Sequence, residues 1–330
     1  MEKKTLADIG ELEFIERIRK SMPFDGGSII RSAGDDCLVT EPFSEHPALF
    51  TTDTFIDGVH FTPAYASYKE IGHRCMAASV SDIAAMSGIP LYSLVSMSMP
   101  RSLLVDDAAG LFKGLSETAE RYGCPACGGE TTSTPGPLTV TVTIIGFAER
   151  DRLVTRNGAQ VGDGIFVTGF IGDAMAGLIA FQENQADCHT LKRKFLTPEA
   201  RIDISRKLTK SFRLTSMIDL SDGLASDLLH ICMESEVGAV IEADRLPFSE
   251  EFQKLMNKTS RDPIEFALTA GEDYELLFTS DNDSSDTMTI PGLPLTRIGT
   301  ITRRQKGITI RFSDGSQEKI SKKGYEHFTT

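Results

Sequence analysis

The sequence predicts a two-domain protein of mixed α and β structure, with an α+β domain followed by an α/β domain. Three observations support this fold class. The chain has 330 residues, which is long enough for two hydrophobic cores. Segments typical of strands and of helices interleave along the first half. A second series of strand, turn and helix patterns then begins. We therefore expect domains at residues 1–149 and 150–330.

The first domain is expected to be a mixed sheet with helices. Apolar and polar residues alternate, as in half-buried strands, at residues 48–56, 91–100 and 137–149. Residues 67–88 and 103–123 have helical spacing instead, and each segment ends in glycine. These interleaved patterns indicate an α+β unit.

The second domain begins with a strand at about 164–168, a glycine-rich turn and a helix from Asp173. Thr197 is a candidate N-cap of a later helix, with Pro198 at its first position. A strand at about 216–220 then leads into a helix at about 223–235. Further strands are expected within residues 238–247 and 274–280, and a hairpin with an Asp-Gly turn is expected within 308–320.

Charge and hydrophobicity argue against nucleic-acid and membrane partners. The net charge is −13, from 47 acidic and 34 basic side chains, and no long run of Lys or Arg is present. We therefore expect no nucleic-acid partner. No apolar run approaches the roughly 20 residues of a membrane helix, and the N-terminal pattern is acidic and amphipathic rather than a signal core. We expect a cytoplasmic protein with no membrane partner.

One C-x-x-C pair occurs among the six cysteines, at Cys124 and Cys127. A redox or metal-binding pair is one interpretation. However, the pair leads into GGETT, which we interpret as a glycine turn, and no second C-x-x-C completes a zinc site. We favour reduced, partly buried thiols.

A set of carboxylates shares one sequence context, in which the acid follows an apolar segment through Ser, Thr or Gly. Its members are Asp53, Asp82, Glu130, Asp219 and Asp222, and the GDD segment adds Asp35 and Asp36. Each acid alone could be a turn or capping residue. Together they occupy the ends of strands and helices, where sheet-based enzymes place their ligand sites.

Such a set needs cations if its members lie close together. Two carboxylates about 4 Å apart repel by roughly 4 kcal/mol at an effective dielectric constant of about 20. Oxygen ligands without His or Cys favour Mg²⁺ over zinc, and Mg²⁺ usually joins carboxylates to substrate phosphates. The acids therefore predict metal-dependent phosphoryl chemistry.

The segment VTGFIGDAMAG, at residues 167–177, offers a possible cradle for a phosphate, because a glycine-rich turn precedes a helix start. It matches neither G-x-x-x-x-G-K-[ST] nor G-x-G-x-x-G, and neither motif occurs in this chain. A turn that only packs the helix explains the segment equally well. If it is a cradle, Arg156 is a candidate for a further phosphate contact.

A series of segments, taken in order, resembles the thiamine-monophosphate kinase family. They are GDD, TTDTFIDGVHF, IGHRCMAASVSDIAAMSGIP, GGETT, TRNGAQVGD, VTGFIGDAMAGL, MIDLSDGL, AGEDYELLF and GYEHF. The similarity covers nearly the whole chain. TTDxxxxGVHF and GEDYELLF distinguish this family from the other branches of its superfamily, which includes aminoimidazole ribonucleotide synthetase.

The resemblance implies an N-terminal domain that pairs with its copy in a homodimer, and a C-terminal domain that covers the active site. It also implies ATP as co-substrate, thiamine monophosphate as acceptor and several Mg²⁺ ions per site. The acceptor is already a phosphate oxyanion, so no general base is needed. Positioning and charge neutralisation then carry catalysis.

The resemblance also implies roles for single residues. Positions that bind metal fall on Asp35, Asp36, Thr52, Asp53, Asp82, Glu130, Asp219 and Asp222. Positions that contact ATP fall on Gly128, Gly129, Arg156 and Ser221. Positions that contact thiamine phosphate fall on His60, Glu272 and the aromatic Tyr325. Without the family, His60 is equally a hydrogen-bonded turn residue and Glu272 a capping or pairing residue. Asp227 matches no family role, and either hydrogen-bonds locally or faces solvent.

The chain departs from the family pattern at three points. Glu130 stands where Asp is usual, AGED replaces Gly-Gly-Glu-Asp, and Tyr325 stands where many members have Trp. Two alternatives therefore accompany the kinase prediction. One is another ATP-dependent enzyme of the superfamily, similar to aminoimidazole ribonucleotide synthetase. The other is a non-catalytic sensor of nucleotide or thiamine phosphate.

Overall fold

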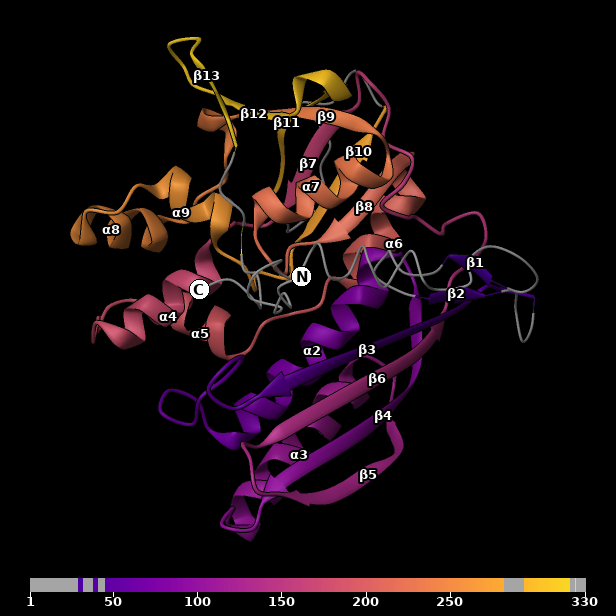
Figure 1. The fold of residues 1–330 in the computed structure, drawn as a ribbon, viewed down its shortest axis with the longest axis vertical. Coiled ribbons are helices and arrows are strands. Elements are labelled where there is room, and N and C mark those ends of the chain that lie inside the picture. The colour runs from indigo at the N-terminus through magenta and orange to yellow at the C-terminus, as the bar shows by residue number, and fades with distance from the viewer. Residues whose placement is uncertain (1–28, 32–37, 41–44, 282–293, 321–323, 325–330) are drawn as a thin grey trace, which may run out of the picture.

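Two β-sheets, each with its own helices, make up the computed structural model (Figure 1). The structure describes residues 29–31, 38–40, 45–281, 294–320 and 324. The predictions for Asp35, Asp36 and Tyr325 fall outside these residues. Two mixed sheets with helices agree with the predicted fold class.

The first sheet has six strands among the described residues, in the order β1-β2-β3-β6-β4-β5. β4 and β5 run parallel and the other neighbours run antiparallel. The helices α2 and α3 pack together against this sheet (Figure 1). The bounds are β1 (Ile29–Arg31), β2 (Leu38–Thr40), β3 (Ala48–Ile56), α2 (Tyr68–Ala85), β4 (Ile89–Pro100), α3 (Val105–Arg121), β5 (Ala126–Thr134) and β6 (Thr139–Phe147).

Local sequence explains these elements. Ser67 and Glu70 form a capping box that starts α2, since each side chain accepts a hydrogen bond from the other residue's backbone amide. In β6 the buried residues Val140, Val142 and Ile144 alternate with half-buried threonines. One face of the sheet therefore joins the core, and the other face is left more open.

The second sheet has seven strands in the order β13-β12-β9-β11-β7-β10-β8, with one parallel pair, β9 and β12. β7 and β10 are buried along their whole length and lie side by side between β11 and the edge strand β8. The strands are β7 (Gly164–Thr168), β8 (Leu214–Asp219), β9 (Val237–Glu242), β10 (Leu276–Ser280), β11 (Leu295–Arg303), β12 (Ile308–Arg311) and β13 (Gln317–Lys319).

Helices surround this sheet, and α5 and α6 contact α2 of the first half (Figure 1). The helices are α4 (Asp173–Gln182), α5 (His189–Leu196), α6 (Ile202–Ser211), α7 (Leu224–Glu234), η1 (Ala243–Arg245), α8 (Glu250–Thr259), α9 (Pro263–Thr269) and η2 (Arg304–Lys306). None of the helices in the described ranges is long and apolar enough to cross a membrane. The predicted domain boundary lies between β6 and β7, and as a division into domains it stays a prediction.

The helix predicted to start at Thr197 and Pro198 was placed wrongly, because α6 begins later, at Ile202. The Pro198 carbonyl accepts a hydrogen bond from His73 Nε2 at 2.8 Å. The Ala200 amide donates to the Tyr122 hydroxyl oxygen at 2.9 Å. These contacts with the first half hold the segment outside a helix, overriding its local capping signal.

The turn predicted at GGETT is also wrong, because these residues lie inside β5. Gly129 allows this arrangement. It has a φ of +147°, and a Cβ there would lie 1.7 Å from the Val95 carbonyl oxygen of the neighbouring β4. Only glycine fits so close to the next strand.

Candidate active site

A cavity of about 890 Å³ lies between the two halves of the molecule and is lined by residues of both. Its walls come from β3 and the loop after it, from α2 and α4, and from the turns that follow β8 and precede β10. Of the predicted site residues, the structure brings these to the cavity: Thr52, Asp53, His60, Asp82, Asp219, Ser221, Asp222 and Glu272.

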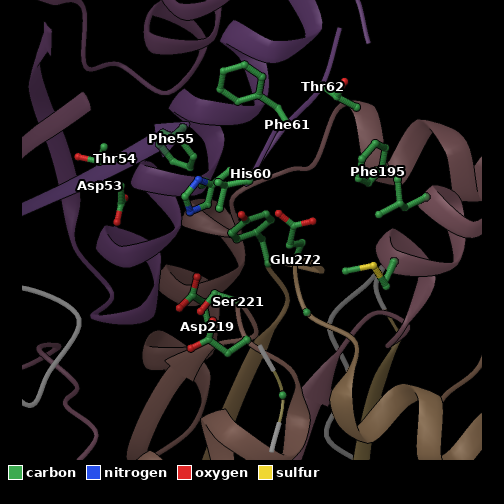
Figure 2. Close-up of a pocket in the computed structure, with 18 of the residues that line it drawn as sticks. Asp53, Thr54, Phe55, His60, Phe61, Thr62, Phe195, Asp219, Ser221 and Glu272 are labelled. Atoms are coloured by element: carbon green, nitrogen blue, oxygen red, sulfur yellow. The ribbon is translucent and has the colours of Figure 1, made fainter. Parts of the chain in front are cut away.

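One end of the cavity is acidic, and we call it the acid end. It contains Asp53 of β3, Asp82 in the last turn of α2, Asp219 at the end of β8 and Asp222 just beyond. Figure 2 labels Asp53 and Asp219. Asp82 lies near the carbonyl end of its helix, where the helix dipole disfavours negative charge. The acid end is therefore suited to cations.

Hydroxyl groups hold two of these carboxylates. Thr51 Oγ1 donates to Asp82 Oδ2, and Ser81 Oγ donates to Asp219 Oδ2 at 2.6 Å. Each donor is adjacent in the sequence to a predicted site residue, Thr51 to Thr52 and Ser81 to Asp82. The hydrogen bonds thus join β3 to α2 and α2 to β8, and they fix the acids of the two halves relative to one another.

Asp227 supports the turn that carries Asp222. Its buried carboxylate accepts hydrogen bonds from the amides of Asp222 at 3.3 Å and Gly223 at 3.0 Å. Burial, followed by the charges of Asp222 and Asp219, raises the pKa of Asp227 well above its usual value. Of the two predicted alternatives, local hydrogen bonding is therefore correct.

The donor chemistry of the acid end fits Mg²⁺. Within the described ranges, no three side chains of His, Cys, Asp or Glu converge into a site that would hold a metal ion by themselves. Mg²⁺ rarely uses such a cage. It binds through one or two carboxylates, with water and substrate phosphates as the other ligands.

The opposite end of the cavity, which we call the ring end, is apolar and aromatic. Its lining residues are Val59, Phe61, Tyr65, Met175, Leu178 and Phe195. Figure 2 shows Phe61 and Phe195 on the side away from Asp53 and Asp219, with Glu272 between the two groups. Apolar walls with a few polar groups are typical of sites for organic ligands.

His60 is a hydrogen-bonded turn residue that also lines the cavity, and its contact with thiamine phosphate stays a prediction. Its Nδ1 accepts a hydrogen bond from the Ile56 amide at 3.0 Å. A neutral imidazole in this position carries its proton on Nε2. Phe55 packs edge-on against the ring, with 5.9 Å between the centroids. His60 is thus held as an oriented donor beside the cavity.

Glu272 lies where the cavity wall joins the second sheet. It has a left-handed backbone with φ of +67°, and its amide donates to the Ser221 carbonyl at 2.8 Å. Its carboxylate forms an ion pair with Arg74 of α2. Tyr274, at φ of +51°, also lines the cavity, and burial raises the pKa of its phenol well above the usual value.

Other predicted residues lie elsewhere. Gly128, Gly129 and Glu130 are exposed on β5, at the edge of the first sheet, and do not line the cavity. The Glu130 carboxylate accepts a hydrogen bond from the next amide in the chain, at 3.0 Å. Arg156 also lies outside the cavity lining, and its charge acts on Asp227. Their predicted contacts with metal or ATP stay predictions.

In the glycine-rich turn before α4, backbone amides already donate to a side chain of the protein itself. Asp273 accepts hydrogen bonds from the amides of Gly172 at 2.5 Å and Ala174 at 3.0 Å. Its carboxyl is buried, which raises its pKa to about 8. These amides are the ones that a bound phosphate would use, so the turn acts as a helix cap rather than an anion cradle.

The C-x-x-C pair consists of two free thiols in different surroundings. Cys124 is buried, which raises its pKa to about 12, whereas Cys127 is exposed on β5. A thiol with such a high pKa is a poor nucleophile at neutral pH. This agrees with the interpretation as reduced thiols.

Sequence reasoning named His60 and Glu272 at this end of the cavity and missed the other residues that shape it. Arg74, Phe195 and Tyr274 all lie in or against the cavity wall, and none was singled out. One signal was available for Arg74, because it interrupts a run of small and apolar residues in a predicted helix. A charge in such a run needs a partner.

Comparisons with known proteins define the class first. Residues 34–148 match the family model for the N-terminal domain of AIR synthase related proteins. Residues 160–311 match the model for the C-terminal domain of the same class. The fold is therefore that of the AIR synthase related proteins, with both domains in their usual order.

Close relatives then identify the family. Thiamine-monophosphate kinase of Rhodopirellula baltica is 32% identical over 90% of this chain and 91% of its own length. The kinase of Aquifex aeolicus is 32% identical, over 98% of this chain and 99% of its own length. The chain belongs to the thiamine-monophosphate kinase family.

Solved structures agree. A structure described as AaThiL complexed with AMPPCP and TMP has a TM-score of 0.87 and 31% identity, and covers 99% of this chain and 100% of its own. Thiamine-monophosphate kinase from Stenotrophomonas maltophilia has a TM-score of 0.74 and 33% identity, over 92% of this chain and 96% of its own. A HypE–HypF complex, at 20% identity, shares the fold alone.

Proposed function

We propose that this protein transfers the terminal phosphoryl group of ATP to thiamine monophosphate, giving ADP and thiamine diphosphate. The observation that carries the proposal is that one cavity joins an acid end to a ring end. It lies in a chain similar along its length to a structure complexed with AMPPCP, an ATP analogue, and TMP.

In this reaction the bond between the terminal phosphorus of ATP and its bridging oxygen breaks, and ADP leaves with that oxygen. A phosphate oxygen of thiamine monophosphate forms the new bond. That oxygen is already an anion at neutral pH, so no side chain has to remove a proton. The protein's task is to hold two anionic phosphates together in line.

The acid end is suited to that task if Mg²⁺ accompanies the phosphates. We assign Asp53, Asp82, Asp219 and Asp222 to metal binding. The Thr52 hydroxyl bonds to Thr143 instead, so its contact with metal stays a prediction. Mg²⁺ held there would supply positive charge beside the phosphates and offset the charge that develops during transfer. The hydrogen bonds from Thr51 and Ser81 hold two of these carboxylates in place.

The ring end is suited to the organic part of the acceptor. Thiamine carries two aromatic rings, one of them a cation, and aromatic walls bind such rings by stacking and cation–π contact. With its rings among Phe61, Phe195 and His60, the molecule would direct its phosphate toward the acids. This orientation explains why both ends belong to one cavity.

A homodimer is part of the proposal, with the open face of the first sheet as its interface. Tyr92 is 52% exposed there and Leu94 40% exposed. Hydrogen-bonded threonine pairs, such as Thr52 with Thr143 at 3.0 Å, lie on the exposed surface. A second copy on this face would also cover Glu130 on β5. Sedimentation of the purified protein tests this part, and a monomer at micromolar concentration would contradict it.

Turnover is tested with purified protein, ATP and thiamine monophosphate at millimolar Mg²⁺, with products separated by chromatography. We expect equal amounts of ADP and thiamine diphosphate, and none after chelation of the metal. ATP hydrolysis without thiamine diphosphate would point to another enzyme of the class. Tight binding of both ligands without turnover would show a sensor. We expect the reaction in the cytoplasm, where ATP is available.

A further inference from the structure

Arg74 is a buried cation that the proposed reaction does not use directly. It lies within α2 among buried side chains, and it is only 4% exposed itself. A guanidinium at this depth is costly unless other groups compensate its charge. Its partners show what it does.

The guanidinium of Arg74 reaches across to the other half of the molecule, where it contacts Phe195 and Glu272. Nη1 donates to the Phe195 carbonyl of α5, and the guanidinium lies over the Phe195 ring, 4.4 Å from the centroid. Nη2 forms the ion pair with Glu272 Oε2, without the alignment of a hydrogen bond. One side chain therefore contacts an aromatic ring and a carboxylate together.

Both partners are walls of the ring end. Phe195 and Glu272 line the cavity, and Figure 2 shows Glu272 between Phe195 and Asp219. The Glu272 amide is also bonded to the Ser221 carbonyl, in the turn that carries part of the acid end. The position of Arg74 thus sets the distance between the Phe195 ring and the Glu272 carboxylate. Through Glu272, it is also linked to the turn that carries Ser221.

The ion pair also changes how Glu272 acts. Its charge is balanced by Arg74, so Glu272 offers a ligand an oriented acceptor rather than a full negative charge. An unpaired carboxylate at this place would attract any cation. A paired one favours a ligand whose shape and hydrogen bonds fit between the ring and the acceptor.

We propose that Arg74 is the positioning residue of the ring end, and that its simultaneous hold on Phe195 and Glu272 sets the affinity for the ring-bearing substrate. The inference rests on the proposed function, which assigns thiamine monophosphate to that end. Arginine suits the role because its planar fork contacts several groups at once, whereas lysine offers a single point charge.

The test is Arg74→Lys, which keeps the charge and loses the fork. We expect the KM for thiamine monophosphate to rise about tenfold while the KM for ATP stays within about twofold. The turnover number at saturation should stay within about threefold, because the acid end is untouched. A purely structural role would move both KM values together or neither.

The matched control is Arg201→Lys. Arg201 forms a buried pair with Glu275, with Nε at 2.8 Å from Oε2 and Nη2 at 2.5 Å from Oε1. Neither residue lines the cavity. We expect this variant to lower the melting temperature about as much as Arg74→Lys, and to leave both KM values unchanged.

The double variant Arg74→Met with Glu272→Gln covers the case in which Arg74→Lys does not fold. It removes both charges, so no unpaired ion remains in the core. We expect a folded protein with a raised KM for thiamine monophosphate alone. The inference is overturned if a folded Arg74 variant keeps the wild-type KM for that substrate, or if the KM for ATP rises equally. Lack of turnover in the wild type would instead overturn the proposed function, and this inference with it.

Discussion

The two ends of the cavity differ in what holds their charged groups. At the acid end, hydroxyl groups hold two of the carboxylates, as Ser81 does for Asp219 and Thr51 does for Asp82. At the ring end a guanidinium holds the one carboxylate, Glu272. Neutral donors orient an acid and leave its charge available for a cation, whereas an arginine balances the charge.

This difference predicts a division of labour. Substitutions at the acid end should change turnover and the requirement for Mg²⁺, because they alter the charge that accompanies the phosphates. Substitutions at the ring end should change the affinity for one substrate. Substitutions at each end, with kinetics for both substrates, test this division.

Asp222→Asn should have the largest effect. The variant keeps the size of the side chain and removes one negative charge from the acid end, so we expect turnover to fall by about a hundredfold or more. The Mg²⁺ concentration for half-maximal activity should rise as well. Asp106→Asn, at an exposed position in the first turn of α3, is the control. Wild-type turnover in the folded Asp222 variant would remove the acid end from the site.

His60→Ala should act on affinity instead. The variant loses a donor beside the cavity together with the acceptor of the Ile56 amide. We expect the KM for thiamine monophosphate to rise about tenfold, with a smaller change in turnover. His46→Ala is a matched control, because His46 stacks on Phe147 at 5.3 Å and does not line the cavity. Equal effects of both variants in steady-state kinetics would refute the assignment of His60.

Asp227 tests whether the acid end depends on its supporting hydrogen bonds. Asp227→Ala leaves two amides without their acceptor, which should lower the free energy of unfolding by about 1–3 kcal/mol. Turnover should fall about fivefold as the turn carrying Asp222 shifts. Asp227→Asn retains an acceptor oxygen and should recover most of the activity. Similar losses in both variants would instead show that the charge of Asp227 matters.

The acid end could be predicted from local sequence patterns, whereas at the ring end only His60 and Glu272 were predicted, and those from the family resemblance. Asp53, Asp82 and Asp222 each follow an apolar segment through Ser or Thr, and Asp219 follows one directly, which is a local pattern. That pattern places them at the ends of elements, and the fold brings those ends together. The pair of Arg74 with Glu272 joins residues far apart in the chain, and no local pattern reports such a contact.

The two wrong predictions, of a helix start and of a turn, also concern segments whose structure is decided by distant contacts. Thr197 and Pro198 carry a capping signal that contacts with His73 and its helix override. β5 was interpreted as a turn because its glycines and hydroxyl residues lack apolar alternation. Its strand pairing comes from β4 instead. Local patterns thus predicted the structure correctly where the burial of the segment's own residues decides it. They failed where contacts with a distant segment decide it.

The smallest expected effect concerns Asp273, which supports the ring end through α4, the helix that carries Met175 and Leu178. Its pKa is raised from 3.8 to about 8 by burial, so the folded protein keeps this proton at pH values where the unfolded chain has lost it. The folded state then binds more protons, and the free energy of unfolding falls as the pH rises from about 4 to about 8. Asp173, whose pKa is raised to about 6, adds to the lower part of this decline.

Asp273→Asn has no proton to lose, so its unfolding free energy should decline less steeply, most visibly above pH 6. Denaturant titrations across this range check the slope. An unchanged slope would show that Asp273 is ionised in the folded protein, held by its two amide donors.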